Sequence, residues 1–556
     1  MGRTRSSHSV EPLSHFIDEY LAYLQESHPT EAAFDGIHLH DDLLENYSRE
    51  SLDAQARDLG GWSRRLEGIA SSTLTAEERL ERQVLADGIR ARLFSLEELR
   101  PWQRNPQHYA TTLADSLGGQ VLFAYASLEE RARRVVSKLR QVPRLLDAAT
   151  KNVTDPPGLF AKVGLESFQG VLSFVEQDLP RAFRSLDDMH LLSDLADAST
   201  LATDALHAYT GHLREGVASR SRASFRLGAD KFAQMLRLNE GIDVPVERLL
   251  EIALRELAAT REEFEKTAAE LGNDAPQVWA DVKSRHPGAG ELLGVVKGHL
   301  EELVTFIQKQ RLVSVPDHKA LRVAPTPDSY RWTSASLWAP GAFEATPLPA
   351  YYYITTVDPR WAPERQEEHL RDFNYAMLPS ISMHEAYPGH YLHFAHLRDI
   401  EKPIRKTMLL MPVSVVEGWA HYSEQLMFDN GYEKGGTEAK LGQLAEALLR
   451  LARTVVGIRL HTEDLSVEQG VRFFQEEAFL EESTARREAE RGTFDPGYVL
   501  YALGKLMLLQ LRADEMAAKG DDFSQKRFHD QFLAQGGLPF WAQRQLMLGE
   551  RGRLLE

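Results

Sequence analysis

Apolar side chains recur at helical spacing in several parts of this sequence, and no other feature limits the possible folds more. Between residues 296 and 307, Val, Leu, Leu and Ile follow one another at steps of three and four residues, which places them on one face of a helix. We expect such faces to pack into the core of a mainly helical protein. The same pattern occurs in three other segments, residues 135–142, 250–257 and 441–455.

One stretch, from about residue 320 to residue 357, departs from this pattern. It is rich in Pro, Thr, Tyr and Trp, and residues 351–356 read Tyr-Tyr-Tyr-Ile-Thr-Thr, a composition typical of strands. Residues 334–338 and 350–356 are the predicted strands. We therefore expect a small β-sheet directly before the segment that carries the candidate chemistry.

A weakly marked boundary lies near residues 225–245, where Gly228, Gly241 and Pro245 interrupt the helical pattern. We predict a helical N-terminal region, residues 1–235, and a catalytic region, residues 236–556, although one continuous domain is also compatible with this pattern. The N-terminal region has no clear catalytic signature. We expect it to act as scaffold and as one wall of a cleft.

Composition excludes several classes of function. The 556 residues include no cysteine, so disulfides, thiolate metal sites and a cysteine nucleophile are excluded. A formal net charge of −18 argues against a nucleic-acid partner. No apolar run approaches the ~20 residues of a membrane span, and residues 1–6 lack the apolar stretch of a signal peptide. We expect a cytoplasmic protein without a membrane partner, and the oligomeric state stays open.

Residues 384–390 read His-Glu-Ala-Tyr-Pro-Gly-His and carry the strongest chemical signal. In a familiar zinc-binding helix, two His ligands lie four residues apart and the Glu beside the first is the general base. Here the spacing is six, and on a regular helix His384 and His390 would point roughly 240° apart. Pro388 and Gly389 permit a kink that brings His390 back beside His384. Without a kink, the segment is a helix end with two unrelated histidines.

A second signal lies downstream, where Glu417, His421 and Glu424 share one face of a predicted helix. A carboxylate from a separate helix would complete a metal site of two His and one Glu. The alternative is a solvated charged face. The neighbouring residues, among them Trp419 and Leu426, are too apolar for that, and buried carboxylates need a partner such as a metal.

Together these residues resemble the DUF885 family of zinc-metallopeptidase-like proteins, whose signature is HExxPGH. The family normally covers nearly the whole chain, and the matches here concentrate between about residues 340 and 512. The N-terminal third is matched only in its helical character. Further matching segments are Pro340–Glu344, Tyr351–Tyr353, Glu417–Ala420, Arg453 with Leu460 and His461, and Asp495–Tyr498 with Tyr501, Gly504 and Lys505.

The resemblance implies a large helical fold like that of the gluzincin peptidases, with a deep cleft and one Zn ion. Carried over residue by residue, it makes His384, His390 and Glu417 the metal ligands and Glu385 the general base. Family members often have a second His directly after the signature. This chain has Tyr391 there, which makes His390 the better ligand.

The reaction of such a site suggests further residues. Zinc lowers the pKa of its bound water to about 7, and Glu385 would pass the water's proton to the leaving amine. The oxyanion that forms needs donors besides the metal. The candidates for this role, each of which could instead be packed in the core, are His461, Tyr498 and Tyr501.

Other residues are candidates for supporting roles. Arg453 and Lys505 could bind a substrate carboxylate, or could form structural ion pairs instead. His421 and Glu424 are expected to orient the metal ligands from outside. His393, one helical turn after the second signature histidine, is the main rival as a ligand.

We therefore predict a zinc-dependent hydrolase, a carboxypeptidase- or oligopeptidase-like enzyme that cleaves short peptides. Two alternatives stay open. The first is a metal-dependent amidohydrolase that uses the same site on a small non-peptide amide. The second is a catalytically inactive helical binding protein, in which Glu385 would be dispensable.

Overall fold

Helices make up most of the molecule, as the apolar periodicity predicts. The computed structural model describes residues 11–218, 221–316, 321–327, 331 and 334–555. Helix accounts for 71% of the structure and strand for 3%, which confirms the mainly helical class. Among the described helices, none is long and apolar enough to cross a membrane.

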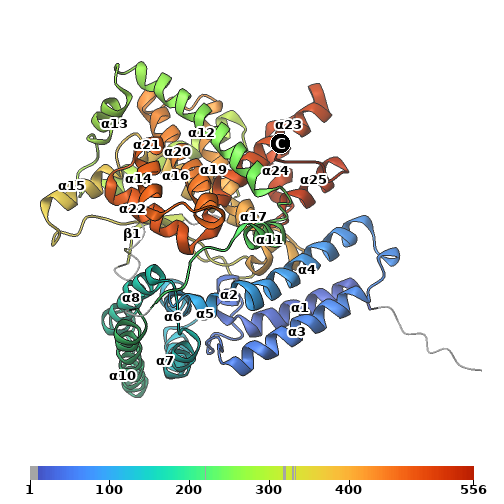
Figure 1. The fold of residues 1–556 in the computed structure, drawn as a ribbon, viewed down its shortest axis with the longest axis vertical. Coiled ribbons are helices and arrows are strands. Elements are labelled where there is room, and N and C mark those ends of the chain that lie inside the picture. Colours follow the sequence, from blue (N-terminus) through green and yellow to red (C-terminus); the bar gives the residue numbers. More distant parts are fainter. Residues whose placement is uncertain (1–10, 219–220, 317–320, 328–330, 332–333, 556) are drawn as a thin grey trace, which may run out of the picture.

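The first ten helices form the lower part of the molecule in Figure 1, coloured blue to teal. We call this part the N-terminal layer. Its helices are α1 (Leu13–Ser27), α2 (Pro29–Phe34), α3 (Arg49–Glu67), α4 (Ala76–Phe94), α5 (Pro101–Arg104), α6 (Gln107–Leu122), α7 (Leu128–Asn152), α8 (Gly158–Ser173), α9 (Leu179–Ala182) and α10 (Met189–Gly211).

The later helices form the upper body in Figure 1. Those before the signature are α11 (Ala229–Glu240), α12 (Val246–Ala269), α13 (Ala275–Lys283), α14 (Leu292–Gln310) and α15 (Pro363–Arg371). From the signature onward they are α16 (Leu378–Glu385), α17 (His390–Leu397), α18 (Pro403–Lys406), α19 (Val413–Asp429), α20 (Gly436–Thr462), α21 (Val467–Ala478), α22 (Glu482–Phe494), α23 (Leu500–Lys519), α24 (Gln525–Ala534) and α25 (Phe540–Leu548).

The four predicted apolar faces lie in α7, α12, α14 and α20, and most of their side chains are buried. The predicted boundary at residue 235 falls inside α11, which packs against α4 of the N-terminal layer. Leu80 and Val84 of α4 also share a small core with Leu538 and Trp541. Apolar contacts therefore join the N-terminal layer to the upper body, and the division into two regions stays a prediction.

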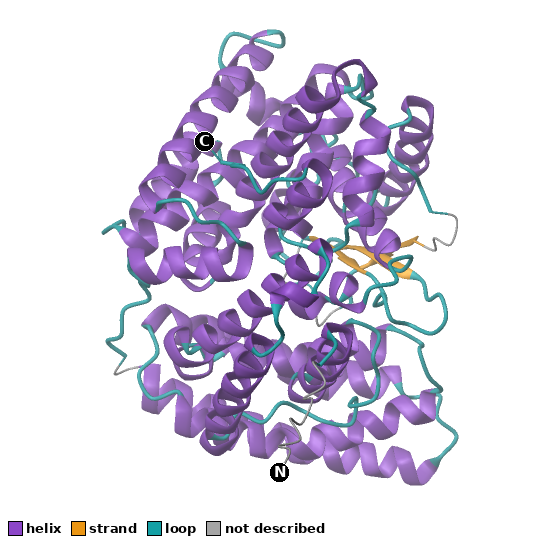
Figure 2. Ribbon diagram, turned by 90° about the vertical axis from the view of Figure 1, so that its right-hand side faces the viewer, coloured by secondary structure: helices purple, strands orange, loops and turns teal. Residues whose placement is uncertain are grey.

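A three-stranded sheet lies near the junction of the two parts (Figure 2). Its central strand β3 (Ala350–Ile354) pairs in parallel with β1 (Leu321–Pro325) and antiparallel with β2 (Ala335–Trp338). β2 and β3 lie within the two predicted strands, whereas the sequence pattern does not single out β1. Tyr352 of β3 is fully buried, and its hydroxyl lies 3.4 Å from the hydroxyl of Ser382 in α16. The sheet thus packs against the helix on which the signature begins.

The segment Pro340–Glu344, which precedes β3, holds the N-terminal layer against the upper body. The Phe343 N–H donates to the Asp35 carbonyl at 2.8 Å, and the Asp35 carboxylate accepts from the Met408 N–H at 2.7 Å. A Cβ atom on Gly341 would collide with the backbone of Asp35. Glycine is therefore required at this close approach.

His38 adds an ionic bridge at the same place. Its Nδ1 lies 2.8 Å from Asp41 Oδ2 and its Nε2 lies 2.9 Å from Glu344 Oε1. Its ring stacks on Tyr125 with the centroids 3.5 Å apart. Burial lowers the pKa of His38, but the two carboxylates outweigh burial and raise this pKa to about 9. His38 is therefore a cation at neutral pH and links Asp41 of the N-terminal layer to Glu344.

We predict a pH-dependent contribution of this bridge to stability. Because folding raises the pKa of His38 from 6.5 to about 9, the contribution is fully present below pH 6.5 and is lost as the pH rises through 9. His38→Gln should lower the free energy of unfolding by about 1–3 kcal/mol at pH 6, and by less at pH 10. Urea unfolding at both pH values measures this difference.

The control is His15→Gln, since the His15 side chain is 58% exposed on α1. It should leave the stability within about 0.5 kcal/mol at either pH. A His38→Gln effect of equal size at pH 6 and pH 10 would contradict the ionic bridge and would indicate a loss of packing alone.

Candidate metal centre

The signature is divided between two helices. α16 ends at Glu385 and α17 begins at His390, so residues 386–389 form the break that the Pro-Gly pair predicts. The rings of His384 and His390 lie beside each other, with centroids 4.7 Å apart and planes at 83°. The two histidines therefore do not point away from each other, as they would on one regular helix.

Hydrogen bonds fix the turn between the two helices. The Gly389 N–H donates to the Met383 carbonyl at 2.9 Å, and the Trp419 indole N–H donates to the Pro388 carbonyl at 2.8 Å. The Tyr387–Pro388 peptide bond is cis. Since Trp419 belongs to α19, the helix that carries Glu417 also holds the turn that positions His390.

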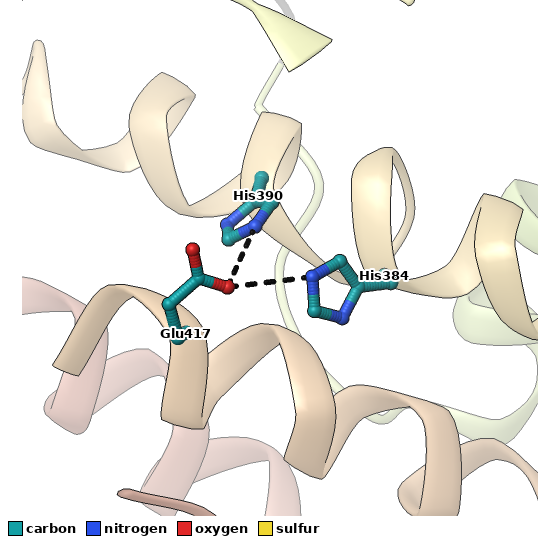
Figure 3. A group of neighbouring side chains, drawn as sticks. All are labelled: His384, His390 and Glu417. Atoms are coloured by element: carbon teal, nitrogen blue, oxygen red, sulfur yellow. Dashed lines mark ion pairs between the residues drawn. The ribbon is translucent and has the colours of Figure 1, made fainter. Parts of the chain in front are cut away.

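Glu417 faces both histidines (Figure 3). Its Oε2 lies 3.4 Å from His384 Nε2 and 3.4 Å from His390 Nε2. Atoms bound at about 2.0–2.1 Å to a tetrahedral zinc ion lie about 3.3–3.4 Å apart, which is the edge of the coordination tetrahedron. The two distances from Glu417 therefore have the length of such an edge, and the candidate ligand atoms of the three residues all lie within 4.8 Å of one another.

The polar atoms of this group are buried and incompletely paired. His384 is 6% exposed and His390 is 8% exposed, and Glu417 Oε2 has no hydrogen-bond partner. Burial raises the pKa of Glu417, but the two histidines outweigh burial and hold it well below its usual range. Two imidazoles and one carboxylate in a buried site are a donor set that suits zinc, so the residues fit the ion that the sequence predicts.

Glu424 supports His384 from behind. Its Oε1 accepts a hydrogen bond from His384 Nδ1 at 2.8 Å, so Nε2 is the nitrogen that a neutral His384 ring can offer to a metal. Glu424 is completely buried and ion-paired with Arg450 Nη2 at 3.2 Å. His421 Nδ1 lies 3.3 Å from Glu424 Oε2, without an aligned hydrogen bond. Both residues predicted to orient the ligands thus lie beside the centre, and Glu424 contacts a ligand directly.

Two contacts with residues far away in the sequence fix the position of α19. The Glu240 carboxylate, at the end of α11, accepts from the backbone N–H groups of Val413 and Ser414 at 3.3 and 2.9 Å and so caps the start of α19. Gly418 of α19 meets Gly504 of α23 so closely that a Cβ atom on either residue would collide with the other helix. This close approach brings α23 next to Glu417.

Glu385 and Tyr501 lie next to the ligands. Glu385 is the last residue of α16, is partly buried, and directly follows His384. The Tyr501 ring on α23 is nearly parallel to the His384 ring, with centroids 6.3 Å apart and planes at 12°. Burial, and then the charge of Glu417, raises the pKa of Tyr501 to about 12, so its hydroxyl stays protonated and can donate a hydrogen bond.

Two of the three predicted oxyanion donors are packed elsewhere. His461 lies almost three helical turns beyond Arg450 on α20, between the rings of Phe225 and Phe232, and its Nε2 donates to the Gly492 carbonyl at 2.8 Å. Tyr498 is completely buried, where its ring fills the space left by Gly457 and Gly492. These are the contacts of packed core residues, and the catalytic role of both residues stays a prediction.

The two predicted substrate-binding cations, whose role stays a prediction, have different surroundings. Both oxygens of the Glu488 carboxylate pair with Arg453, at 2.6 and 2.8 Å, so its guanidinium is already used in an ion pair. Lys505 is buried on α23 near Glu424, where burial lowers its pKa to about 8. His393, the rival ligand, is fully buried and lies outside the group formed by the three predicted ligands.

Sequence reasoning misses two residues that matter for this centre. Arg450 pairs with Glu424, and Glu446 accepts a hydrogen bond from Arg450 in the same helix. Glu446 and Arg450 lie four residues apart on α20, on a helix that is otherwise apolar on several faces. A charged pair at helical spacing inside such an apolar segment predicts buried ionic contacts, and this signal is present in the sequence.

We predict that Gly389 is essential for the geometry of the metal site. The space around Gly389 is the reason, because a Cβ atom would collide with the carbonyl oxygens of His384 and Met383. Gly389→Ala should lower the zinc affinity by at least about tenfold, the lower end of effects seen for residues behind metal ligands.

Competition with a zinc chelator measures this affinity. Gly298→Ala on α14 is the matched control, since nothing lies within 4 Å of the added Cβ atom. It should leave the affinity unchanged. Equal zinc binding by the two variants, with both folded by circular dichroism, would contradict the role of this close approach.

The fold of the chain is shared with proteins of known structure. A candidate lipoprotein of unknown function from Shewanella oneidensis is 23% identical, with a TM-score of 0.80 over 97% of this chain and 100% of that one. A candidate lipoprotein from Colwellia psychrerythraea is 19% identical, with a TM-score of 0.80 over 97% of this chain and 98% of that one. No curated protein matches the chain. The model of the family described as "Bacterial protein of unknown function (DUF885)" matches residues 29–547, and the chain therefore belongs to the DUF885 family.

Proposed function

We propose that this protein is a zinc-dependent peptidase that hydrolyses short peptides. The observation that carries the proposal is the position of Glu417 Oε2, 3.4 Å from each of two histidine Nε2 atoms on separate helices. The hydrogen bond from His384 to the buried Glu424 adds the outer carboxylate that commonly orients a zinc-bound histidine. The resemblance to gluzincin peptidases around residues 384–390 points to the same chemistry.

Each residue around the centre has a separate role in amide hydrolysis. A bound zinc ion would supply a Lewis acid that makes water nucleophilic near neutral pH. Glu385, which follows the first ligand, takes a proton from the attacking water and gives it to the leaving amine. The Tyr501 hydroxyl, next to His384, donates a hydrogen bond to the oxyanion that develops on the substrate carbonyl.

The size of the substrate follows from the helical walls that the resemblance implies. A deep cleft between such walls, one of them the N-terminal layer, would admit short peptides and exclude folded proteins. An amidohydrolase acting on a small non-peptide amide would use the same residues, and profiling with a peptide library separates the two. The cytoplasmic location also stays a prediction.

We predict that the purified protein binds about one equivalent of zinc. His384→Ala and Glu417→Ala should each lose it, because each removes one of three protein ligands. Glu424→Gln should keep zinc at an affinity about 10–100-fold lower, since Gln cannot supply the carboxylate charge behind His384. Metal analysis and chelator competition measure both effects.

The control for the ligand assignment is His393→Gln, which removes the rival histidine and should leave zinc bound. Full metal occupancy in both ligand variants would overturn the assignment. A wild-type protein that binds no zinc would favour the catalytically inactive binding protein.

Glu385→Gln tests the proposed base. The substitution keeps the size of the side chain and removes its basicity, so we expect zinc to be retained and turnover of short peptides to fall by at least about 100-fold. Glu401→Gln, at an exposed position, is the control and should be as active as the wild type. Turnover of Glu385→Gln within a few-fold of the wild-type rate would exclude the mechanism.

A further inference from the structure

Tyr501 is the one predicted oxyanion donor that lies beside the metal ligands. Its ring covers one side of His384, and the ring is only partly buried. A phenol hydroxyl has a single proton, which it can give to one acceptor at a time. The value of Tyr501 as an oxyanion donor therefore depends on what else its hydroxyl contacts.

The guanidinium of Arg491 is that contact. Its Cζ lies 5.8 Å from the Tyr501 ring centroid, and its positive charge acts on the Tyr501 hydroxyl. Arg491 is itself held by Asp495, whose Oδ2 accepts from Nε at 2.9 Å and pairs with Nη2 at 2.8 Å. These contacts leave Nη1 of Arg491 free of Asp495.

Arg491, Asp495 and Tyr501 lie close together in the sequence. Arg491 lies in the last turn of α22, and Asp495 follows at its end, four residues later. The 3₁₀ turn Pro496–Val499 leads directly into α23, which carries Tyr501. The family motif at residues 495–501 thus supplies both the anchor for the guanidinium and the tyrosine that the guanidinium contacts.

Arg453, the other arginine near the ring, cannot act in this way. Its Cζ lies 5.3 Å from the Tyr501 ring centroid, but its Nε and Nη2 both donate to Glu488. The Arg453 side chain is about 10% exposed, whereas that of Arg491 is 34% exposed. Arg453 therefore packs against the ring as part of a closed ion pair, and Arg491 is the arginine that is free to act on the hydroxyl.

A guanidinium has only donors, so Arg491 cannot take the proton of Tyr501. When an Arg491 N–H donates to the phenol oxygen, the hydroxyl proton must point to another acceptor. The positive charge also makes the phenol a stronger donor. The hydroxyl is thereby prepared for an acceptor near the metal ligands before substrate arrives, which is the arrangement that favours stabilisation of a transition state.

We propose that Arg491, held by Asp495, is a positioning residue that directs the Tyr501 hydroxyl proton at the developing oxyanion of the substrate. The proposal rests on the proposed peptidase function. It assigns Arg491 a role in the chemical step, and it differs from a role in binding a substrate carboxylate, which the partial exposure of Arg491 would also permit. The two roles affect different kinetic constants.

The test is a double-mutant cycle in the zinc-loaded full chain. Arg491→Gln, Tyr501→Phe and the double variant are compared for kcat and KM on a library peptide that the wild type cleaves. Affinity for a phosphinic peptide of the same sequence is measured in parallel, since its tetrahedral group resembles the transition state. Zinc content is measured for every variant.

We expect Arg491→Gln and Tyr501→Phe each to lower kcat by about 10–100-fold, near the cost of losing one oxyanion donor. KM should stay within about twofold, and phosphinic affinity should fall in parallel with kcat. The double variant should be no worse than Tyr501→Phe alone, because the two residues act as one unit. Arg491→Lys should recover part of the loss, since it restores a charged donor.

The matched control is Arg486→Gln on the same helix, whose side chain pairs with Glu468 and Glu482. It should leave every measured constant unchanged. Multiplying effects in the double variant would overturn the proposal. So would an increase in KM with kcat intact, which would make Arg491 a substrate anchor instead.

Failure of the proposed function is distinguishable from failure of this inference. If the wild type binds zinc but cleaves no peptide, the peptidase function is overturned, and the cycle on phosphinic affinity still decides whether Arg491 acts through Tyr501. A loss of phosphinic affinity that is the same in Arg491→Gln, Tyr501→Phe and the double variant supports the role. Independent losses, or no loss in Arg491→Gln, overturn it.

Discussion

The close approach of Gly389 to the last turn of α16 is the constraint on which the candidate centre depends. With no Cβ atom, residue 389 can lie against the carbonyl oxygens of His384 and Met383, and its N–H donates to the second of these. α17 therefore starts within a few ångströms of the end of α16 instead of continuing away from it. The indole of Trp419 donates to the Pro388 carbonyl and fixes α19 to the same turn. Two histidines and one glutamate from three helices then meet at one point.

A buried ionic chain continues from this point into the core. Glu424 accepts a hydrogen bond from His384 and is paired with Arg450, which in turn contacts Glu446. Burying such charges is costly unless each has a partner, so the chain is stable only as a connected set. The exception is Glu417 Oε2, which is buried and without a hydrogen-bond partner. This carboxylate oxygen faces two imidazoles without a hydrogen bond, and it is the position at which a cation would complete the set.

The sequence predicts the structure best in short motifs, where both the residue types and their spacing point to the same site. Residues 384–390 contain two of the three proposed ligands, the Pro-Gly pair at the break and the proposed base, and the two halves of the signature meet as the Pro-Gly pair predicts. Residues that depend on distant partners are less predictable. Nothing in the local sequence of His461 reveals that Phe225 and Phe232 enclose it, or that Glu488 occupies Arg453. For the same reason Arg491 is not apparent until its position beside the Tyr501 ring is known.

By itself, the sequence determines the helical class, the position of the small sheet and the set of residues able to bind a metal, because these follow from periodicity and residue chemistry within short segments. Only the tertiary structure decides which of the candidates share one place. It selects Glu417 and Tyr501, because the contact between Gly418 and Gly504 presses α19 against α23. It packs His461, near the end of α20, against Phe225 and Phe232, and it packs Tyr498, in the turn before α23, against Gly457 and Gly492. Contacts between residues far apart in the chain depend on packing, and packing is a property of the whole fold.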